Sequence, residues 1–324
     1  MKKKIIIGKR KPLVRHLLLV EGISRSGKFL LADLLSGLRG IEPVQYYGLL
    51  EHIPVFEAAG LIDRRTAEEI LRCEIDTHCY EMLIGRNLNH RVSDKSSIFK
   101  NPRAKEFVRR SAIADDETLN RFYQHKAYSL FILHEIMPYI RLYFDTFKNI
   151  TIKTISVRRH PVDLVYSWHR RGLMERLGKD PKLFMIPAEG GRGPMPWFVH
   201  GRQEEYYALS SLDRIIFCIE QLFKKYNSGY CRLPPAMKKK ILFVDYETIV
   251  TDTKSVIQRL SGFLQKGVLP EMKGILRREH LPGKHLAEAR EKKMAEIKEI
   301  ASASYFWRLQ KLASDYNSAH TIPQ

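Results

Sequence analysis

An apolar stretch followed at once by a glycine-rich turn constrains the fold of this chain more than any other feature. Leu17 to Val20 is an apolar run typical of a buried strand, and Gly22 to Lys28 reads Gly-Ile-Ser-Arg-Ser-Gly-Lys. An apolar run at helical spacing then continues to Leu38. A strand, a glycine turn and a helix in this order present backbone amides and the positive end of the helix to an anion. The sequence therefore predicts a phosphate-binding loop within an α/β fold.

Two kinds of phosphate ligand fit this loop. Gly22-x-x-x-x-Gly27-Lys28 matches the nucleoside-triphosphate pattern, but Phe29 stands where that pattern has the Ser or Thr that holds magnesium. Arg25-Ser26-Gly27 also resembles the loop with which sulfotransferases bind a 5′-phosphosulfate, with Lys28 in place of the usual Thr or Ser. The loop by itself does not decide between these ligands.

Composition and charge narrow the class of protein. The chain has 324 residues, of which 44% are hydrophobic, so it is long enough and apolar enough to bury a core. Its net charge of +19 favours acidic partners. The four cysteines form no Cys-x-x-Cys pair, and no His or Cys cluster has a zinc spacing, so we expect no metal. No apolar run approaches the length of a membrane span, and we expect a cytoplasmic protein.

A second strand-to-helix junction carries basic residues at its turn. Thr151 to Arg158 is dense in β-branched residues, as expected for a buried parallel strand. Arg159-His160-Pro161 follows directly. Pro161 suits the first position of a helix, because its missing N–H has no intrahelical partner there, and His160 would be the preceding cap residue.

At this point the sequence resembles a known family. Arg159-His160-Pro161-x-Asp163, with Ser167 eight positions after the arginine, is similar to the motif with which sulfotransferases hold the 3′-phosphate of 3′-phosphoadenosine-5′-phosphosulfate (PAPS). The segment 241–252, Ile-Leu-Phe-Val-Asp-Tyr-Glu-Thr-Ile-Val-Thr-Asp, resembles a later segment of the family, and the likeness spans roughly residues 14–265. It implies a three-layer P-loop-like α/β fold with a central, mainly parallel sheet. We expect residues 1–324 to form a single domain, with a basic extension at 1–13 and a helical tail at 286–324.

The resemblance also implies roles for individual residues. Sulfuryl transfer places charge on the bridging oxygen of the departing phosphate, and fixed cations can stabilise it without a metal. Those cations would be Arg25 and Lys28. The donor-binding residues implied by the motifs are Ser24, Arg25, Ser26, Gly27, Lys28, Phe29, Arg159 and Ser167, with Arg278 and Lys284 from a basic C-terminal segment. Candidates for the base that accepts the proton of the acceptor hydroxyl are Glu51, His52 and His90.

The other segments give coarser expectations. Residues 61–84 and 206–226 and the tail 286–316 have helical periodicity, and 116–147 predicts a long helix kinked near Pro138. The polar loop 85–102 is a candidate lid. Residues 179–197, rich in Gly and Pro, predict an irregular segment that is either a wall of the acceptor site or a solvent-exposed loop.

Two alternatives from other classes stay open. One is a kinase or NTPase that uses ATP and magnesium, in which Asp245, at the end of an apolar run, would bind the metal. The other is a non-enzymatic protein that binds polyanions through its positive charge. For a sulfotransferase, the acceptor would carry a hydroxyl on a carbohydrate, an anionic small molecule or another small molecule. No nucleic-acid partner is expected, and the sequence does not define the oligomeric state.

Overall fold

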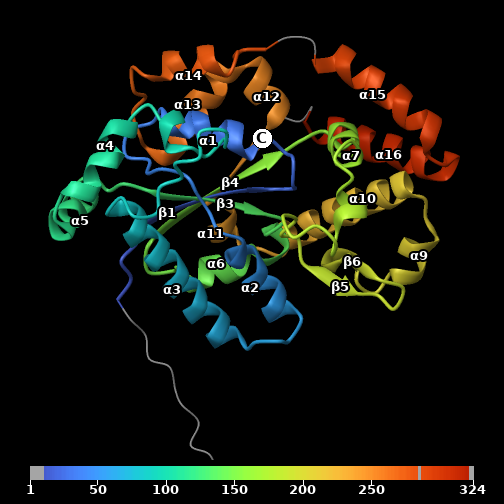
Figure 1. Cartoon of the computed structure of the whole chain (residues 1–324). Coiled ribbons are helices and arrows are strands. Elements are labelled where there is room, and N and C mark those ends of the chain that lie inside the picture. Colours follow the sequence, from blue (N-terminus) through green and yellow to red (C-terminus); the bar gives the residue numbers. More distant parts are fainter. Residues whose placement is uncertain (1–10, 284–285, 321–324) are drawn as a thin grey trace, which may run out of the picture.

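A five-stranded parallel sheet forms the centre of the protein. The structure, a computed structural model, describes residues 11–283 and 286–320. The strands lie in the order β2-β3-β1-β4-β7, and every neighbouring pair is parallel (Figure 1). Their bounds are β1 (His16–Gly22), β2 (Gln45–Tyr46), β3 (Ser129–His134), β4 (Thr151–Arg158) and β7 (Ile241–Asp245). The predicted α/β fold with a mainly parallel sheet is confirmed.

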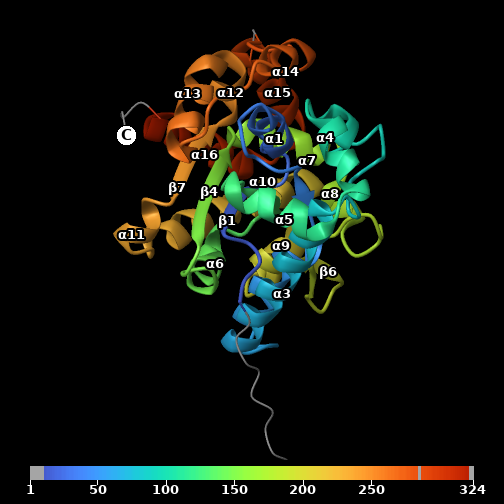
Figure 2. The same ribbon diagram turned by 90° about the vertical axis from the view of Figure 1, so that its left-hand side faces the viewer.

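Helices cover both faces of this sheet (Figures 1 and 2). One face packs against α1 (Lys28–Ser36), α12 (Tyr246–Thr251), α13 (Thr253–Leu264) and α14 (Met272–Arg278). The other face packs against α2 (Gly48–Ala58), α3 (Arg64–Leu83), α4 (Ala104–Arg109), α5 (Asp115–Gln124) and α6 (Ile140–Thr146). The short α11 (Pro235–Lys238) precedes β7.

A third group of helices forms its own core beside the sheet. It contains α7 (Pro161–His169), α8 (Leu173–Arg176), α9 (Gln203–Ala208), α10 (Ser211–Cys231), α15 (Leu286–Ile300) and α16 (Ala303–His320). In Figure 1 the red α15 and α16 lie beside α7 and α10, and buried side chains from both ends of the chain meet in this core. The predicted helical tail therefore packs against the rest of the protein.

Side-chain alternation in β1 joins the two faces. Leu17 and Leu19 point into the core shared with α2 and α3, whereas Leu18 and Val20 point towards α1. All four are fully buried. A strand covered on both sides must be apolar on both faces, which is why the sequence shows a continuous apolar run here. The run ends at the sheet's carboxyl edge, where parallel α/β sheets bind ligands.

Two expectations about secondary structure were wrong. The long helix predicted over 116–147 is instead α5, the central strand β3, a short 3-10 turn and α6. The apolar Leu-Phe-Ile-Leu of β3 fits a helix or a strand equally well by periodicity, and only its pairing with β1 settles it. The segment 179–197 is also not wholly irregular, because β5 (Pro187–Glu189) and β6 (Pro194–Pro196) pair in an antiparallel hairpin.

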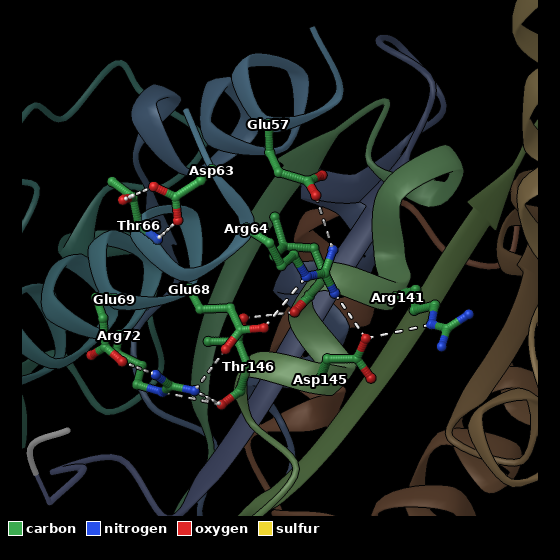
Figure 3. A network of polar contacts seen from close by, with 11 residues as sticks. Glu57, Asp63, Arg64, Thr66, Glu68, Glu69, Arg72, Arg141, Asp145 and Thr146 are labelled. Atoms are coloured by element: carbon green, nitrogen blue, oxygen red, sulfur yellow. Dashed lines mark hydrogen bonds and ion pairs between the residues drawn. The ribbon is translucent and has the colours of Figure 1, made fainter. Parts of the chain in front are cut away.

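A polar network joins α2 to α3 and α6 (Figure 3). Arg64 of α3 forms ion pairs with Glu57 of α2 at 3.6 Å and with Asp145 of α6 at 2.8 Å. Arg72, about two turns further along α3, donates to the carbonyl of Thr146 at 3.1 Å. Three helices are thus held in register, and α2 has a fixed position relative to the strand ends.

Within the described ranges, no helix is both long enough and apolar enough to cross a membrane.

Candidate active site

The loop between β1 and α1 has the shape of an anion cradle. Gly22 and Gly27 have φ angles of 156° and 101°, in the region that favours glycine. A Cβ at Gly22 would lie 2.5 Å from the carbonyl oxygen of Val157, and one at Gly27 would collide with the ring of Tyr246. Both glycines are therefore required by close packing. The turn is closed by the amide of Ser26, which donates to the carbonyl of Ile23 at 3.0 Å.

Lys28 has a different position from the one predicted for it. Its ammonium nitrogen donates to the backbone carbonyls of Gly22 at 2.7 Å and Ile23 at 3.0 Å, and the residue is buried. Burial lowers the pKa of Lys28, and the nearby carboxylates of Glu135, Glu51 and Glu21 counteract that effect. Lys28 thus braces the loop from inside the protein instead of extending towards a ligand.

The second basic motif, Arg159 to Ser167, contacts this loop at Arg25. Arg25 donates from Nε to the hydroxyl of Ser167 at 3.2 Å. Arg159 donates to the carbonyl of Arg25 at 2.6 Å, and its guanidinium lies 4.3 Å from the centre of the Tyr246 ring. Burial lowers the pKa of Arg25, and Arg171 and Arg159 lower it further. In the described part of the chain, none of these three arginines forms an ion pair with a carboxylate. Together they place positive charge beside the glycine loop.

Two buried polar atoms at this site have no hydrogen-bond partner among the described residues. The hydroxyl of Ser26 and Nε of Arg159 are both buried, and neither makes a hydrogen bond within the described residues. Burying a donor without a partner is unfavourable by roughly 1–3 kcal/mol, so such atoms commonly mark a ligand site. Ser26 and Arg159 come from the two predicted phosphate-binding segments, and a molecule with two phosphate groups would satisfy both.

The helix that follows Arg159 is held firmly in place. Pro161 is its first residue, and Nδ1 of His160 accepts a hydrogen bond from the amide of Val162 at 3.3 Å, which confirms the predicted cap. Asp163 forms ion pairs with Arg290 at 3.0 Å and Lys293 at 2.5 Å, both on α15. Although burial raises the pKa of Asp163, the hydrogen bond and charge of Lys293 and the charge of Arg290 keep it below its usual value. The motif's aspartate therefore anchors the tail.

A histidine that the sequence reading missed lies at the carboxyl end of β3. Oε1 of Glu51 accepts from the backbone amide of His134 at 2.6 Å and contacts Nδ1 of the same residue, also at 2.6 Å. Because Oε1 accepts the amide proton, the contact with the ring is best formed by Nδ1–H as donor. That tautomer leaves Nε2 with a free lone pair. Burial, followed by the charge of Lys28, lowers the pKa of His134 to about 3, so the ring is neutral at physiological pH.

Buried carboxylates surround this histidine and Lys28. Burial raises the pKa of Glu51 to about 8 and also raises the pKa of Glu21 and of Glu135. Glu21 accepts a hydrogen bond from Ser156, and Glu135 accepts one from the amide of Ser24 at 2.6 Å. The loop, through Ser24, is thereby linked to the residue that follows His134. His134-Glu135 stands at the end of β3, which is the sequence signal for this pair, but the pattern of residues 116–147 predicts a helix there.

The other predicted site residues lie elsewhere. His52 contacts the carbonyl of Phe184 at 2.7 Å and so ties α2 to the 179–197 segment. His90 is exposed and packs its ring against Phe99. Phe29, on the first turn of α1, packs against the core on that face of the sheet.

Arg278, one of the two predicted C-terminal cations, does not join the glycine loop. Arg278 pairs with Asp33 at 3.2 Å and donates to the carbonyl of Lys100 at 2.6 Å. These contacts tie the 85–102 loop to α14 and to the later part of α1, away from the N-terminal turn of that helix. Lys284 lies outside the described residues.

The carboxylate of Asp245, the candidate magnesium ligand of the kinase alternative, is already paired with an arginine. Arg158 and Asp245 face each other in the β4–β7 register and pair through two contacts, at 2.9 and 3.3 Å. Among the described residues, no group of three or more His, Cys, Asp and Glu side chains has an arrangement that could hold a metal ion.

Parallel strands, the glycine loop and the arginines together define an α/β protein with a positively charged site at the carboxyl edge of its sheet. Comparison with protein families is more specific: the model described as "Sulfotransferase domain" matches residues 63–299, more than half of the chain. The protein therefore belongs to the sulfotransferase family and is a sulfotransferase. This assignment excludes the kinase and the non-enzymatic alternatives. The match begins after the glycine loop and ends before α16.

Solved structures of low identity are also similar to the chain. The sulfotransferase domain from the curacin biosynthetic pathway is 14% identical, with 95% of this chain and 99% of that one covered and a TM-score of 0.48. The corresponding domain of the Synechococcus PCC 7002 olefin synthase is 14% identical, with coverage of 99% and 100% and a TM-score of 0.45. Sulfotransferase STF9 from Mycobacterium avium is 13% identical, with coverage of 96% and 78% and a TM-score of 0.47. The search of curated proteins found no match.

Proposed function

We propose that this sulfotransferase uses PAPS as its donor and transfers the sulfuryl group to the hydroxyl of a small acceptor. The observation that carries the proposal is the meeting of Arg159 and Ser167 with the glycine loop at Arg25. PAPS carries phosphate groups at its 5′ and 3′ positions. The orphaned donors of Ser26 and Arg159 fit the two groups, one in each segment.

Each loop residue has a distinct role in this proposal. Ser26 and the amides of Gly27 to Phe29 bind the 5′-phosphate at the start of α1. Arg25 stabilises the negative charge that develops on the bridging oxygen. Arg159 binds the 3′-phosphate through two N–H groups, a geometry that lysine lacks, and Ser167 adds a neutral donor. Lys28 keeps the loop closed through its carbonyls.

We assign the base to His134, with Glu51 as its positioning residue. When bound, the donor supplies a sulfuryl group that moves in line to the acceptor oxygen, as the bond to the 5′-phosphate breaks with its electron pair. Nε2 of His134 accepts the proton of the acceptor hydroxyl. The carboxylate of Glu51 holds Nδ1–H and stabilises the imidazolium that forms, as in other acid–base pairs of this kind. Glu51 therefore acts through His134 and not directly on the acceptor.

A transfer assay tests this function. The protein is incubated with ³⁵S-labelled PAPS, excess EDTA and a panel of phenols, alcohols and oligosaccharides. We expect labelled product with at least one acceptor, no effect of EDTA, and loss of transfer in Arg159→Ala. Arg170→Ala, at the other end of α7 and exposed, is the matched control and should retain activity. Transfer that survives in Arg159→Ala, or that EDTA abolishes, would contradict the proposal.

A further inference from the structure

A large cavity opens beside the glycine loop. Its volume is about 870 Å³, within the range of pockets that enclose a whole small molecule. It lies between α10, α16 and the carboxyl ends of β4 and β7, and its lining includes Phe223, Tyr230, Phe243 and Trp307. In Figure 1, α16 and α10 bound this side of the sheet.

One end of the cavity reaches the glycine loop and the second basic motif. Ser26 and Arg159 form part of its wall, so the cavity borders the expected position of the donor phosphates. Tyr226 also lines it. A hydroxyl delivered from this cavity would therefore arrive beside the glycine loop, at Ser26 and Arg159.

The outer walls are aromatic. Phe243 and Tyr230 pack edge to face at 4.9 Å between ring centres, and Phe223 and Tyr316 do so at 6.3 Å. Trp307 is 61% exposed although it is one of the largest apolar side chains. An exposed tryptophan at the mouth of an aromatic-lined cavity offers a flat surface on which another ring can stack.

The charges at this cavity do not select a charged ligand. Arg308 and Lys224 are both paired with Glu220, and Arg158 is paired with Asp245. Lys311 and Asp315, both exposed, place one charge of each sign at the mouth. Aromatic rings on α10, β7 and α16 therefore supply the part of the lining that can contact an uncharged ligand.

We expect the donor's nucleoside on the side of Arg159 that faces Tyr246, which is not part of the cavity lining. The guanidinium of Arg159 stacks on Tyr246, the first residue of α12, and α12 packs on the face of the sheet that carries α1. The cavity opens instead towards α10 and α16. Since α16 begins at Ala303, beyond the end of the family match at residue 299, this outer wall is a feature of the chain's own tail.

We propose that this cavity binds the acceptor, and that the acceptor is an aromatic hydroxyl compound. The inference rests on the proposed function. It assigns Trp307 as a residue that determines specificity by stacking on the acceptor ring, outside the catalytic machinery.

Calorimetric titration tests this assignment with 2-naphthol as the probe. Adenosine 3′,5′-bisphosphate is titrated separately, and methyl β-glucoside serves as the non-aromatic comparison. Trp307→Ala removes the stacking surface without opening the core. Ile300→Ala, which truncates another exposed apolar residue, 56% exposed and outside the cavity lining, is the matched control. Asn227→Trp, at an exposed position of the lining on α10, fills the cavity and serves as a second variant.

We expect 2-naphthol to bind and methyl β-glucoside not to bind. Trp307→Ala should weaken 2-naphthol binding about tenfold, the size expected for losing one aromatic contact, and Asn227→Trp should abolish it. Ile300→Ala should change nothing, and all variants should keep their affinity for the bisphosphate. Equal 2-naphthol affinity in the wild type and Trp307→Ala, or no binding at all, would overturn the assignment. Loss of bisphosphate affinity in Trp307→Ala would place the nucleoside in the cavity and also overturn it.

These outcomes are separate from the proposed function. If the wild type fails to bind the bisphosphate, the donor proposal fails, whatever 2-naphthol does. If the bisphosphate binds and 2-naphthol does not, the donor proposal stands and the acceptor assignment is wrong.

Discussion

Replacing Lys28 by methionine separates two roles that a lysine can have in a phosphate loop. In the structure the ammonium is buried and donates to the carbonyls of Gly22 and Ile23. Hydrogen bonds that involve a charged group contribute roughly 1.5–3 kcal/mol each, and two of them give about 4 kcal/mol. The carboxylates of Glu21 and Glu51 also lose a compensating charge, although both can take up a proton. We therefore expect Lys28→Met to lower the free energy of unfolding by about 4 kcal/mol.

Guanidinium chloride denaturation at pH 7 measures this loss, from the midpoint at an unchanged slope. Arg25→Ala is the control, because this exposed arginine should affect ligand binding and leave the free energy of unfolding nearly unchanged. The reasoning would be refuted if Lys28→Met lost less than about 1 kcal/mol of stability while its affinity for adenosine 3′,5′-bisphosphate fell by a factor of ten or more. That result would make Lys28 a ligand-binding residue.

Three further predictions concern the base and the tail. His134→Ala should lower kcat by about 10²–10⁴-fold with little change in bisphosphate affinity, whereas retained kcat would exclude His134 as the base. Initial rates should rise as the pH increases through about 8, because Glu51, whose pKa burial raises to that value, orients His134 best as a carboxylate; in Glu51→Gln the rate should be lower and this rise absent. Asp163→Asn should lower the free energy of unfolding by about 2–4 kcal/mol. Since the pKa of Asp163 lies below its usual value, denaturation curves should show this difference at neutral pH and lose it as the pH falls below about 4.

The phosphate loop and the second basic motif were predictable because their signals are local. Gly27 must be glycine for its own φ angle, and Pro161 marks the first residue of its helix. Strand β1 was predicted from its continuous apolar run and β4 from its β-branched residues, because buried parallel strands favour both. Each of these inferences needed only a few neighbouring residues.

The contact between Glu51 and His134, the proposed base, was not predictable, because it depends on packing between distant segments. Glu51 and His134 are 83 positions apart, and they meet only because β3 lies next to β1 with its carboxyl end at the loop. Periodicity did not distinguish β3 from a helix. The side chain of Lys28 likewise points into the protein because of how the loop closes, and residue spacing in the sequence does not predict that closure. The cavity beside the loop exists only once α16 has packed against α10.

Titration of the whole protein with adenosine 3′,5′-bisphosphate in EDTA, and separately with ATP and magnesium, tests the central claim most directly. We predict that the bisphosphate binds with micromolar or tighter affinity and that Arg159→Ala removes this binding. We also predict no magnesium-dependent binding of ATP, since Asp245 is paired with Arg158. Binding of ATP with magnesium in the absence of any affinity for the bisphosphate would contradict the account.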